Sequence, residues 1–296
     1  MIVQQLLNGL ISGSVYALFA LGFTLIFGTH RILNLAHAGV FMTGAFIGYY
    51  CVVLGLPLWL AIVLAMIGSG LLSYFIDIVA FQQLRAQKQI EFAALISSIG
   101  ANLILINIAQ RLSDTQVLSF PFGTFPTIFF HFAGVRVSAL QLMIVALVAV
   151  LFGLLLFYLY KTSFGRQVRA VAGNERAAML LGVNPKSVYF QTFFISGALA
   201  GIAGVLIGLL FSSVYFLMGE PYLLRGFVIV ILGGLGSIPG AVVAGLLLGV
   251  MQTLATAYLP PGLTDAMIYS LLFVGLLIRP SGLFGGQAIA VAAGRR

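Results

Sequence analysis

The chain has 296 residues, of which 61% are hydrophobic and only 7% are charged, and its formal net charge is +8. Soluble domains carry about 25% charged residues, so a chain this poor in charge needs the lipid bilayer as its solvent. This composition excludes a water-soluble enzyme, and it excludes a nucleic-acid partner because the basic residues are spread over loops that flank apolar segments.

Apolar segments long enough to span a bilayer, about 20 residues each, follow one another along the whole chain. The first, Met1–Phe27, lacks the basic n-region of a signal peptide and is expected to be a retained span. The expected spans are 5–28, 36–56, 58–81, 92–110, 137–160, 189–212, 223–237, 240–258 and 265–279. The seventh is short and broken by glycine. We therefore predict an all-α polytopic transmembrane helical bundle with eight or nine spans, including a broken helix, in one domain over residues 1–296.

The first polar interruption lies between the first two spans, where Asn34 and His37 precede Gly39. Asn34 is suited to cap the second helix, and His37 then lies one turn inside it. Polar residues at such a place are costly unless they face other helices, water or a substrate. Two interpretations stay open: part of a substrate path, or a helix cap with an interfacial histidine.

Further polar residues lie inside the third and fourth spans. Asp77 is the only acid well inside a span, and the sequence favours a pair with Arg85 as much as a role in transport. Ser97, Ser98 and Asn102 are candidates to line a path, although serine often bonds its own helix backbone.

The main external segment is expected at residues 111–136, which are rich in phenylalanine and contain Pro121. The phenylalanines are expected at the membrane interface or over the outer mouth. The same outer rim is expected to carry Asp114, Glu220 and Asp265.

The longest polar interruption, residues 161–188, holds five of the fourteen Lys and Arg residues. Basic loops stay on the cytoplasmic side, and this orientation leaves eleven of the fourteen basic residues inside, with the N-terminus outside and the C-terminus inside. A short helix is expected from Arg169 to Leu181, ended by Gly182. The segment is either a docking surface for a partner or a solvated loop whose charges set the topology.

Two glycine-rich stretches follow. The sixth span carries glycines on one helix face, which predicts close helix packing within or between subunits. These residues are Gly197, Gly201, Gly204 and Gly208. The second stretch, Leu232–Gly240, cannot continue a regular helix, and Pro239 suits the first turn of a new one. This break either lines the substrate path with Gly236, Ser237 and Pro239 or forms a tight packing turn.

No sequence pattern indicates catalysis, a cofactor or a metal. The chain lacks GxxxxGK[ST], HExxH, CxxC and GxSxG, and its single cysteine, Cys51, cannot form a disulfide within the chain. An ion-coupled secondary transporter would use membrane-embedded acids, and only Asp77 qualifies, away from the centre of its span.

Four stretches together resemble the inner-membrane permeases of branched-chain amino acid ABC importers, specifically the first of the two permease types. The resemblance covers nearly the whole chain. Its motifs are the opening NGLISGSVYALFALGFTLIFG, Asn34-Leu-Ala-His37, the loop pattern Gly165-Arg166, Arg169-Ala170, Asn174, Ala177-Ala178 and Leu181-Gly182-Val183, and Gly233-Gly234-Leu-Gly236-Ser237-Ile-Pro239-Gly240-Ala241.

The resemblance implies a role in the import of leucine, isoleucine and valine across a bacterial inner membrane. It implies a second related permease, two ATP-binding subunits and a periplasmic substrate-binding protein as partners, besides membrane lipid. The loop at 161–188 would be the coupling segment, docking an ATP-binding subunit through Gly165, Arg166, Arg169, Asn174, Glu175, Arg176 and Gly182. The substrate path would contain Asn34, His37, Gly39, Ser97, Asn102, Gly236, Ser237 and Pro239.

One departure from the family pattern bears on the substrate. Many relatives read Asn-x-Ala-His-Gly-Glu, whereas this chain has Ala38 and Gly39 at the last two positions. A carboxylate in the path could distinguish a zwitterionic amino acid from a neutral amide. Members of the family similar to this one move urea or short amides, which stay the alternative substrates.

Overall fold

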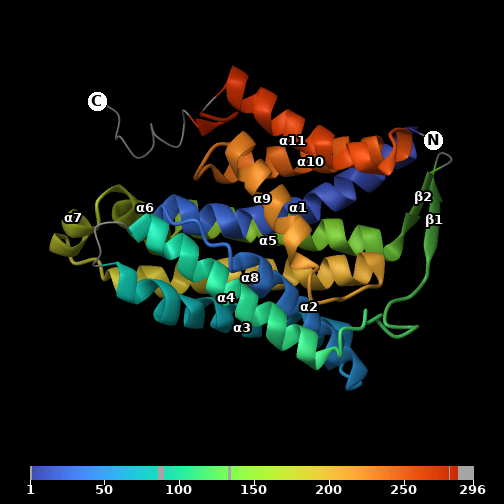
Figure 1. Ribbon diagram of the computed structural model, residues 1–296, viewed down its shortest axis with the longest axis horizontal. Coiled ribbons are helices and arrows are strands. Elements are labelled where there is room, and N and C mark those ends of the chain that lie inside the picture. The colour runs from blue at the N-terminus through green and yellow to red at the C-terminus, as the bar shows by residue number, and fades with distance from the viewer. Residues whose placement is uncertain (1, 86–89, 133–134, 280, 286–296) are drawn as a thin grey trace. The chain divides into compact units, whose positions relative to one another are not determined.

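The computed structural model describes residues 2–85, 90–132, 135–279 and 281–285. Lys88, Arg295 and Arg296, which contribute to the predicted orientation, lie outside these residues. The described chain is almost entirely helical (Figure 1), and six of its helices are long and apolar enough to cross a membrane. The all-α polytopic architecture is confirmed, and the count of eight or nine spans stays a prediction.

The elements follow the predicted apolar segments closely. In chain order they are α1 (Ile2–His30), α2 (His37–Val53), α3 (Leu58–Ile76), the π-turn η1 (Asp77–Phe81), the 3₁₀-turn η2 (Gln82–Leu84), α4 (Ile90–Leu112), β1 (Phe129–Phe132), β2 (Val135–Ser138), α5 (Ala139–Lys161), α6 (Ser163–Gly173), α7 (Glu175–Leu180), α8 (Pro185–Phe211), α9 (Gly219–Gly233), α10 (Ile238–Tyr258) and α11 (Pro261–Ile278).

The chain divides into two compact units, each assembled from separate segments. Unit 1 comprises Met1–Thr24, Pro126–Arg169 and Leu224–Arg296, and unit 2 comprises Leu25–Phe125 and Ala170–Leu223. Helices α1 and α9 each contribute residues to both units.

Unit 2 is built around α8, which packs against α2 and α3. Glycine permits this approach, because a Cβ on Gly204 would overlap the carbonyl oxygen of Phe41 and a Cβ on Gly201 would overlap the side chain of Ser69. Gly44 of α2 lies against the backbone of Gly201 in the same way. Small residues let helix backbones pack closely, and this packing is a main cause of helix association in lipid. Burial of apolar surface contributes little free energy there, because lipid tails are themselves apolar.

Unit 1 pairs the first part of α1 with α10. A Cβ on Gly9 would lie 2.6 Å from the Cα atom of Val250, and a Cβ on Gly13 would lie 2.9 Å from the carbonyl oxygen of Gly245. The two helices therefore touch backbone to backbone along this seam.

The predicted break in the glycine-rich stretch of unit 1 is present. Helix α9 ends at Gly233, and Gly234 and Gly236 adopt positive φ values of 101° and 81°, which glycine accepts without strain. Ser237 then caps α10, because its hydroxyl accepts a hydrogen bond from the amide of Gly240 at 3.2 Å, with Pro239 in the first turn.

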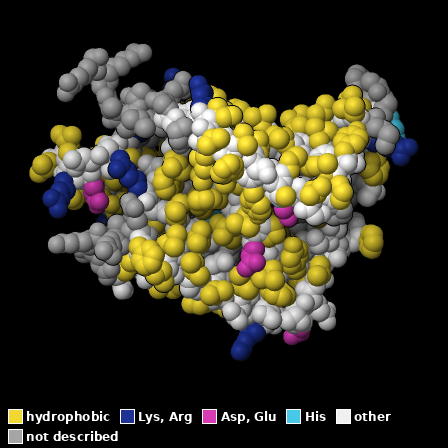
Figure 2. Space-filling model, turned by 45° about the horizontal axis from the view of Figure 1, so that its top comes forward, with side chains coloured by type: hydrophobic (Ala, Val, Ile, Leu, Met, Phe, Trp, Pro, Cys, Tyr) yellow, Lys and Arg dark blue, Asp and Glu magenta, His cyan; other side chains and the backbone are white. Residues whose placement is uncertain are grey.

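Apolar side chains cover most of the face shown in Figure 2, and the Lys and Arg side chains on that face do not gather into one patch. On α5 the exposed residues include Leu142, Val150, Leu154 and Phe157. An apolar exposed surface of this kind is what lipid contact requires.

Two local predictions differ from the structure. The helix expected from Arg169 to Leu181 is two helices, because Asn174 adopts an extended conformation and its side chain accepts from the amide of Ala177 at 3.0 Å, which starts α7. The fifth span, expected from residue 137, begins at Ala139, because β2 pairs with β1 in a short antiparallel hairpin.

Candidate functional site

Helix α2 begins halfway along α4, which is itself long and apolar enough to span a membrane. A Cβ on Gly39, in the first turn of α2, would lie 2.8 Å from Oδ1 of Asn102 and 2.7 Å from Cδ1 of Leu105. Asn102 is near the middle of Ile90–Leu112. The start of α2 therefore lies beside the middle of a helix long enough to span a membrane, and irregular backbone inside a bilayer is tolerated only if it lines a cavity or is buried in protein.

The start of α2 has no side-chain cap. Its N-cap residue is Ala36, in helical conformation, and the prediction that Asn34 caps this helix is wrong. Asn34 lies two residues too early, so its backbone carbonyl accepts from the amide of His37 at 3.3 Å while its side-chain amide has no hydrogen-bond partner among the described residues. The first turn carries the positive end of a helix dipole, and the amides of His37 and Ala38 donate to the backbone carbonyls of Asn34 and Leu35 at 3.3 and 3.4 Å.

Polar side chains from α4 surround this start. The hydroxyl of Ser98 accepts from the amide of Leu35 at 3.2 Å and donates to the carbonyl of Leu95 at 2.8 Å. Asn102 is 9% exposed, and its Oδ1 has no hydrogen-bond partner within the described part of the chain. A buried amide oxygen without a partner costs roughly 1–3 kcal/mol, so its retention at this place indicates a role that packing does not explain.

The start of α9 meets the start of α2. A Cβ on Gly219 would overlap the carbonyl oxygen of Ala38, so only glycine allows this approach. The rings of Phe41 and Tyr222 stack at 4.9 Å between the same two helices. Two helix starts thus converge at one point of unit 2.

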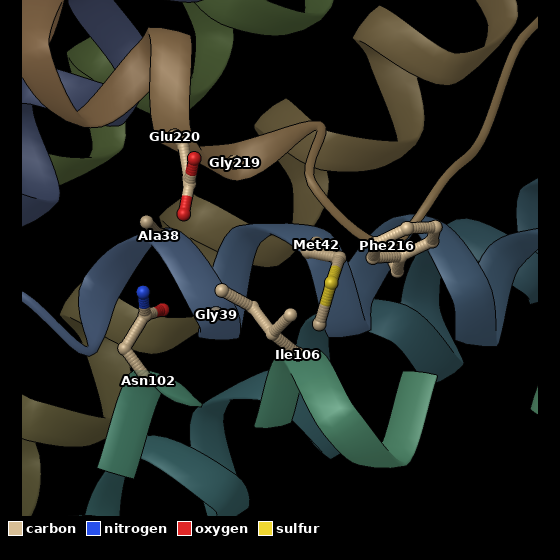
Figure 3. Close-up of a pocket in the computed structure, with 8 residues that line it drawn as sticks. All are labelled: Ala38, Gly39, Met42, Asn102, Ile106, Phe216, Gly219 and Glu220. Atoms are coloured by element: carbon tan, nitrogen blue, oxygen red, sulfur yellow. The ribbon is translucent and has the colours of Figure 1, made fainter. Parts of the chain in front are cut away.

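A narrow pocket lies at this convergence (Figure 3), with about 150 Å³ of space not filled by atoms and too little width for a water-sized sphere. Its lining residues are Ala38, Gly39, Met42, Asn102, Ile106, Phe216, Gly219 and Glu220. Figure 3 shows Glu220 and Asn102 on opposite sides of the start of α2, and Met42, Ile106 and Phe216 together at the other end. The pocket therefore has a polar end and an apolar end.

The structure brings some predicted path residues together and leaves others apart. Asn34, His37, Gly39 and Asn102 all belong to unit 2 around the start of α2, and Asn34 and His37 are 2% and 0% exposed. Ser97 is half-buried, and its neighbour Ser98 makes the contact with the segment before α2. The remaining candidates, Gly236, Ser237 and Pro239, belong to unit 1, where they form the turn and cap that start α10.

Sequence reasoning missed Glu220. It was expected at an outer rim, but the first turn of α9 brings it beside Ala38 and Gly39 in the pocket. The sequence signal was Gly219, because a glycine directly before an acid at a helix start permits close backbone approach.

The predicted docking segment joins the ends of α5 and α8. A Cβ on Gly165 would overlap the carbonyl of Leu159, and Nη1 of Arg169 donates to that same carbonyl at 2.5 Å, so both residues close the end of α5. Arg166, Asn174, Glu175 and Arg176 are exposed, and Gly182 ends α7 with a positive φ of 83°. Leu180 and Leu181 are 90% and 83% exposed beside them.

Other predicted features have structural roles within unit 2. The glycines of α8 face three neighbours: Gly197 and Gly201 meet α3, Gly204 meets α2, and Gly208 meets Phe120 and Val214. Asp77 and Arg85 form an ion pair, and the Arg85 guanidinium lies 3.8 Å from the ring centroid of Tyr189. Among the described residues, no group of three or more His, Cys, Asp or Glu side chains could hold a metal ion.

The fold and the convergent helix starts define a polytopic membrane protein of the permease class. The family model described as "Branched-chain amino acid transport system / permease component" matches residues 5–278, and the chain belongs to this family. It is thus a component of a transport system and not an enzyme.

The alignments with similar proteins extend over almost the whole chain. The chain is 34% identical to the high-affinity branched-chain amino acid transport system permease protein BraD of Pseudomonas aeruginosa, over 96% of this chain and 95% of the relative. It is 32% identical to the corresponding protein LivH of Escherichia coli K12, with the same coverage. It is 28% identical to a probable branched-chain amino acid transport permease of Methanocaldococcus jannaschii, over 95% and 92%. No solved structure matches the chain significantly.

Proposed function

We propose that this chain is the membrane-spanning permease subunit of an ATP-driven importer for branched-chain amino acids. The observation that carries the proposal is the start of α2 beside the middle of α4, a helix long enough to span a membrane, with the polar side chains of Asn34 and Asn102 next to it. Transporters place their substrate sites where broken helices expose their N-termini near the membrane midplane. The printed names of the relatives supply the substrate class.

The pocket geometry supports transport by alternating access. The pocket is too narrow for water as it stands, so a substrate passes only when α2, α4 or α9 moves. The chain has no phosphate-binding loop, and the energy for that movement comes from two ATP-binding partner subunits. A second related permease completes the path, and a periplasmic binding protein delivers the substrate.

The segment from α6 to α7 is the docking surface for the ATP-binding subunit in this proposal. Its exposed arginines include Arg166 and Arg176, and Leu180 and Leu181 later in the same segment are also exposed. Apolar side chains this exposed outside a lipid surface are typical of a protein interface. The same segment then lies in the cytoplasm, which gives a periplasmic N-terminus and a cytoplasmic C-terminus.

The test is purification of the tagged chain from its own membranes in mild detergent, with the associated proteins identified by mass spectrometry. We expect a second permease and two copies of an ATP-binding subunit. The isolated chain, or a homo-oligomer without an ATPase, would overturn the importer and make the basic loop a topology signal only. ATP-dependent uptake of radiolabelled leucine by the reconstituted complex then tests the substrate class.

A further inference from the structure

We infer that Glu220 and Asn102 bind the ammonium group of a zwitterionic α-amino acid in the pocket at the start of α2. The inference rests on the proposed transport function and names the substrate chemistry that this pocket recognises. It selects an amino acid over urea and short amides.

The polar end of the pocket has acceptors that the described protein groups do not use. Oδ1 of Asn102 is buried, faces Gly39 and has no hydrogen-bond partner among the described residues. Neither of the two ion pairs recorded in the described ranges involves Glu220. A carboxylate and an amide oxygen on opposite sides of one helix start (Figure 3) are acceptors only, which is the complement of an ammonium group with its three donors.

The start of α2 supplies the opposite charge. The start of α2 has no side-chain cap and carries the positive end of the helix dipole, while the amides of His37 and Ala38 donate to the carbonyls of Asn34 and Leu35. A substrate carboxylate binds such a helix start in other transporter folds. An α-amino acid carries its ammonium and carboxylate groups on adjacent carbon atoms, so both groups meet their complements at this one end of the pocket.

The apolar end suits the side chain of the same ligand. Met42, Ile106 and Phe216 lie together there and contribute no charge (Figure 3). Methionine and aromatic side chains adapt to branched aliphatic groups through many weak contacts. A neutral amide such as urea carries no charge to pair with the exposed Glu220 carboxylate and would leave the apolar end unfilled.

The test compares two substitutions in the complete importer reconstituted in proteoliposomes with its binding protein. Glu220→Gln keeps the shape and removes the charge, and we expect the kcat/KM for ATP-driven leucine uptake to fall about tenfold or more. Asn102→Leu keeps the volume and removes an acceptor that has no protein partner, so we expect a similar fall without loss of thermal stability. Asp114→Asn is the matched control, because it removes an exposed acid outside the pocket at a positive φ that asparagine accepts.

The outcomes separate this inference from the proposed function. Leucine uptake that falls in both pocket variants, with unchanged membrane abundance and unchanged ATP hydrolysis stimulated by the binding protein, supports it. Uptake equal to the wild type in Glu220→Gln overturns it and leaves the importer intact. Uptake of a different apolar amino acid that depends on Glu220 supports it and overturns the branched-chain substrate. Uptake of urea in place of any amino acid overturns both.

Discussion

At the scale of single residues, polar groups inside this chain fall into two kinds. Asp77 forms an ion pair with Arg85, and the hydroxyl of Ser237 accepts a hydrogen bond from the amide of Gly240. The side chains of Asn34 and Asn102 retain buried atoms without such partners. Burial of an unpaired polar atom lowers the stability of the fold. We therefore interpret the unpaired atoms of Asn34 and Asn102 as retained for function.

The pair of Asp77 and Arg85 gives a prediction about stability. Asp77→Ala leaves the half-buried guanidinium of Arg85 without its carboxylate, and we expect the free energy of unfolding to fall by about 3–5 kcal/mol. Thermal unfolding of the purified protein in detergent measures the loss. The double variant Asp77→Leu with Arg85→Met is the control, because removal of both charges leaves none unpaired and should recover most of the stability. A single variant as stable as the wild type would show that the pair contributes nothing.

At the scale of helices, the sequence predicts where apolar segments lie but not the depth at which they begin. The break at Leu232–Gly240 was predictable, because glycine and proline cannot continue a regular helix. The start of α2 was placed correctly to within a residue at His37. Its position beside the middle of α4 depends on the contact of Gly39 with Asn102, which joins residues 63 positions apart.

The site was predicted in part for the same reason. Asn34, His37 and Asn102 stand out in the sequence as polar residues inside apolar segments. Glu220 does not, because its place beside Ala38 follows from the approach of α9 to α2 through Gly219. The proposed role of Glu220 rests on this contact between two helices, and a single sequence contains no information about such a contact.

Packing of α8 gives a prediction at this scale. Gly201→Leu would force a side chain into Ser69 and the carbonyl oxygen of Ala65 in α3, and we expect loss of most of the folded, monodisperse protein. Gly100→Leu in α4 is the matched control, since a Cβ there meets nothing within 4 Å. Fluorescence-detected size-exclusion chromatography of tagged variants measures both. Equal folded yields of the two variants would show that this contact is not needed for assembly.

At the scale of the whole molecule, the proposed importer has its transport path and its source of energy in different chains. Its charged residues are few, its exposed surface includes lipid-type apolar faces such as that of α5, and its sequence has no ATP-binding loop. In the proposed importer, the energy of ATP hydrolysis reaches this chain through a surface that contacts another protein. The segment from α6 to α7 combines basic charge with two strongly exposed leucines. The side of the membrane on which this segment lies therefore decides whether it can contact a cytoplasmic partner.

Membrane orientation can be measured with introduced cysteines in a Cys51→Ala background. Leu180 ends α7, five residues before the start of α8 at Pro185, and Phe122 follows Phe120, which packs against Gly208 near the far end of α8. The 27 residues of α8 span about 40 Å, more than the roughly 30 Å hydrocarbon core. We expect an impermeant maleimide outside the inner membrane to label Phe122→Cys and not Leu180→Cys, and inverted vesicles to reverse the result. Labelling of Leu180→Cys from outside would invert the proposed topology.

The docking segment gives the last prediction. Leu180→Glu places a charge at the most exposed apolar position of α7, where a folded chain loses nothing by it but an apolar partner surface must desolvate the charge. We therefore expect normal membrane insertion and at least a tenfold loss of ATP hydrolysis stimulated by the binding protein, together with loss of the co-purified ATP-binding subunit. Phe122→Glu is the matched control, since Phe122 is also fully exposed and lies at the opposite end of unit 2. If Leu180→Glu retains the ATPase as Phe122→Glu does, the basic loop sets the topology and the coupling surface lies elsewhere.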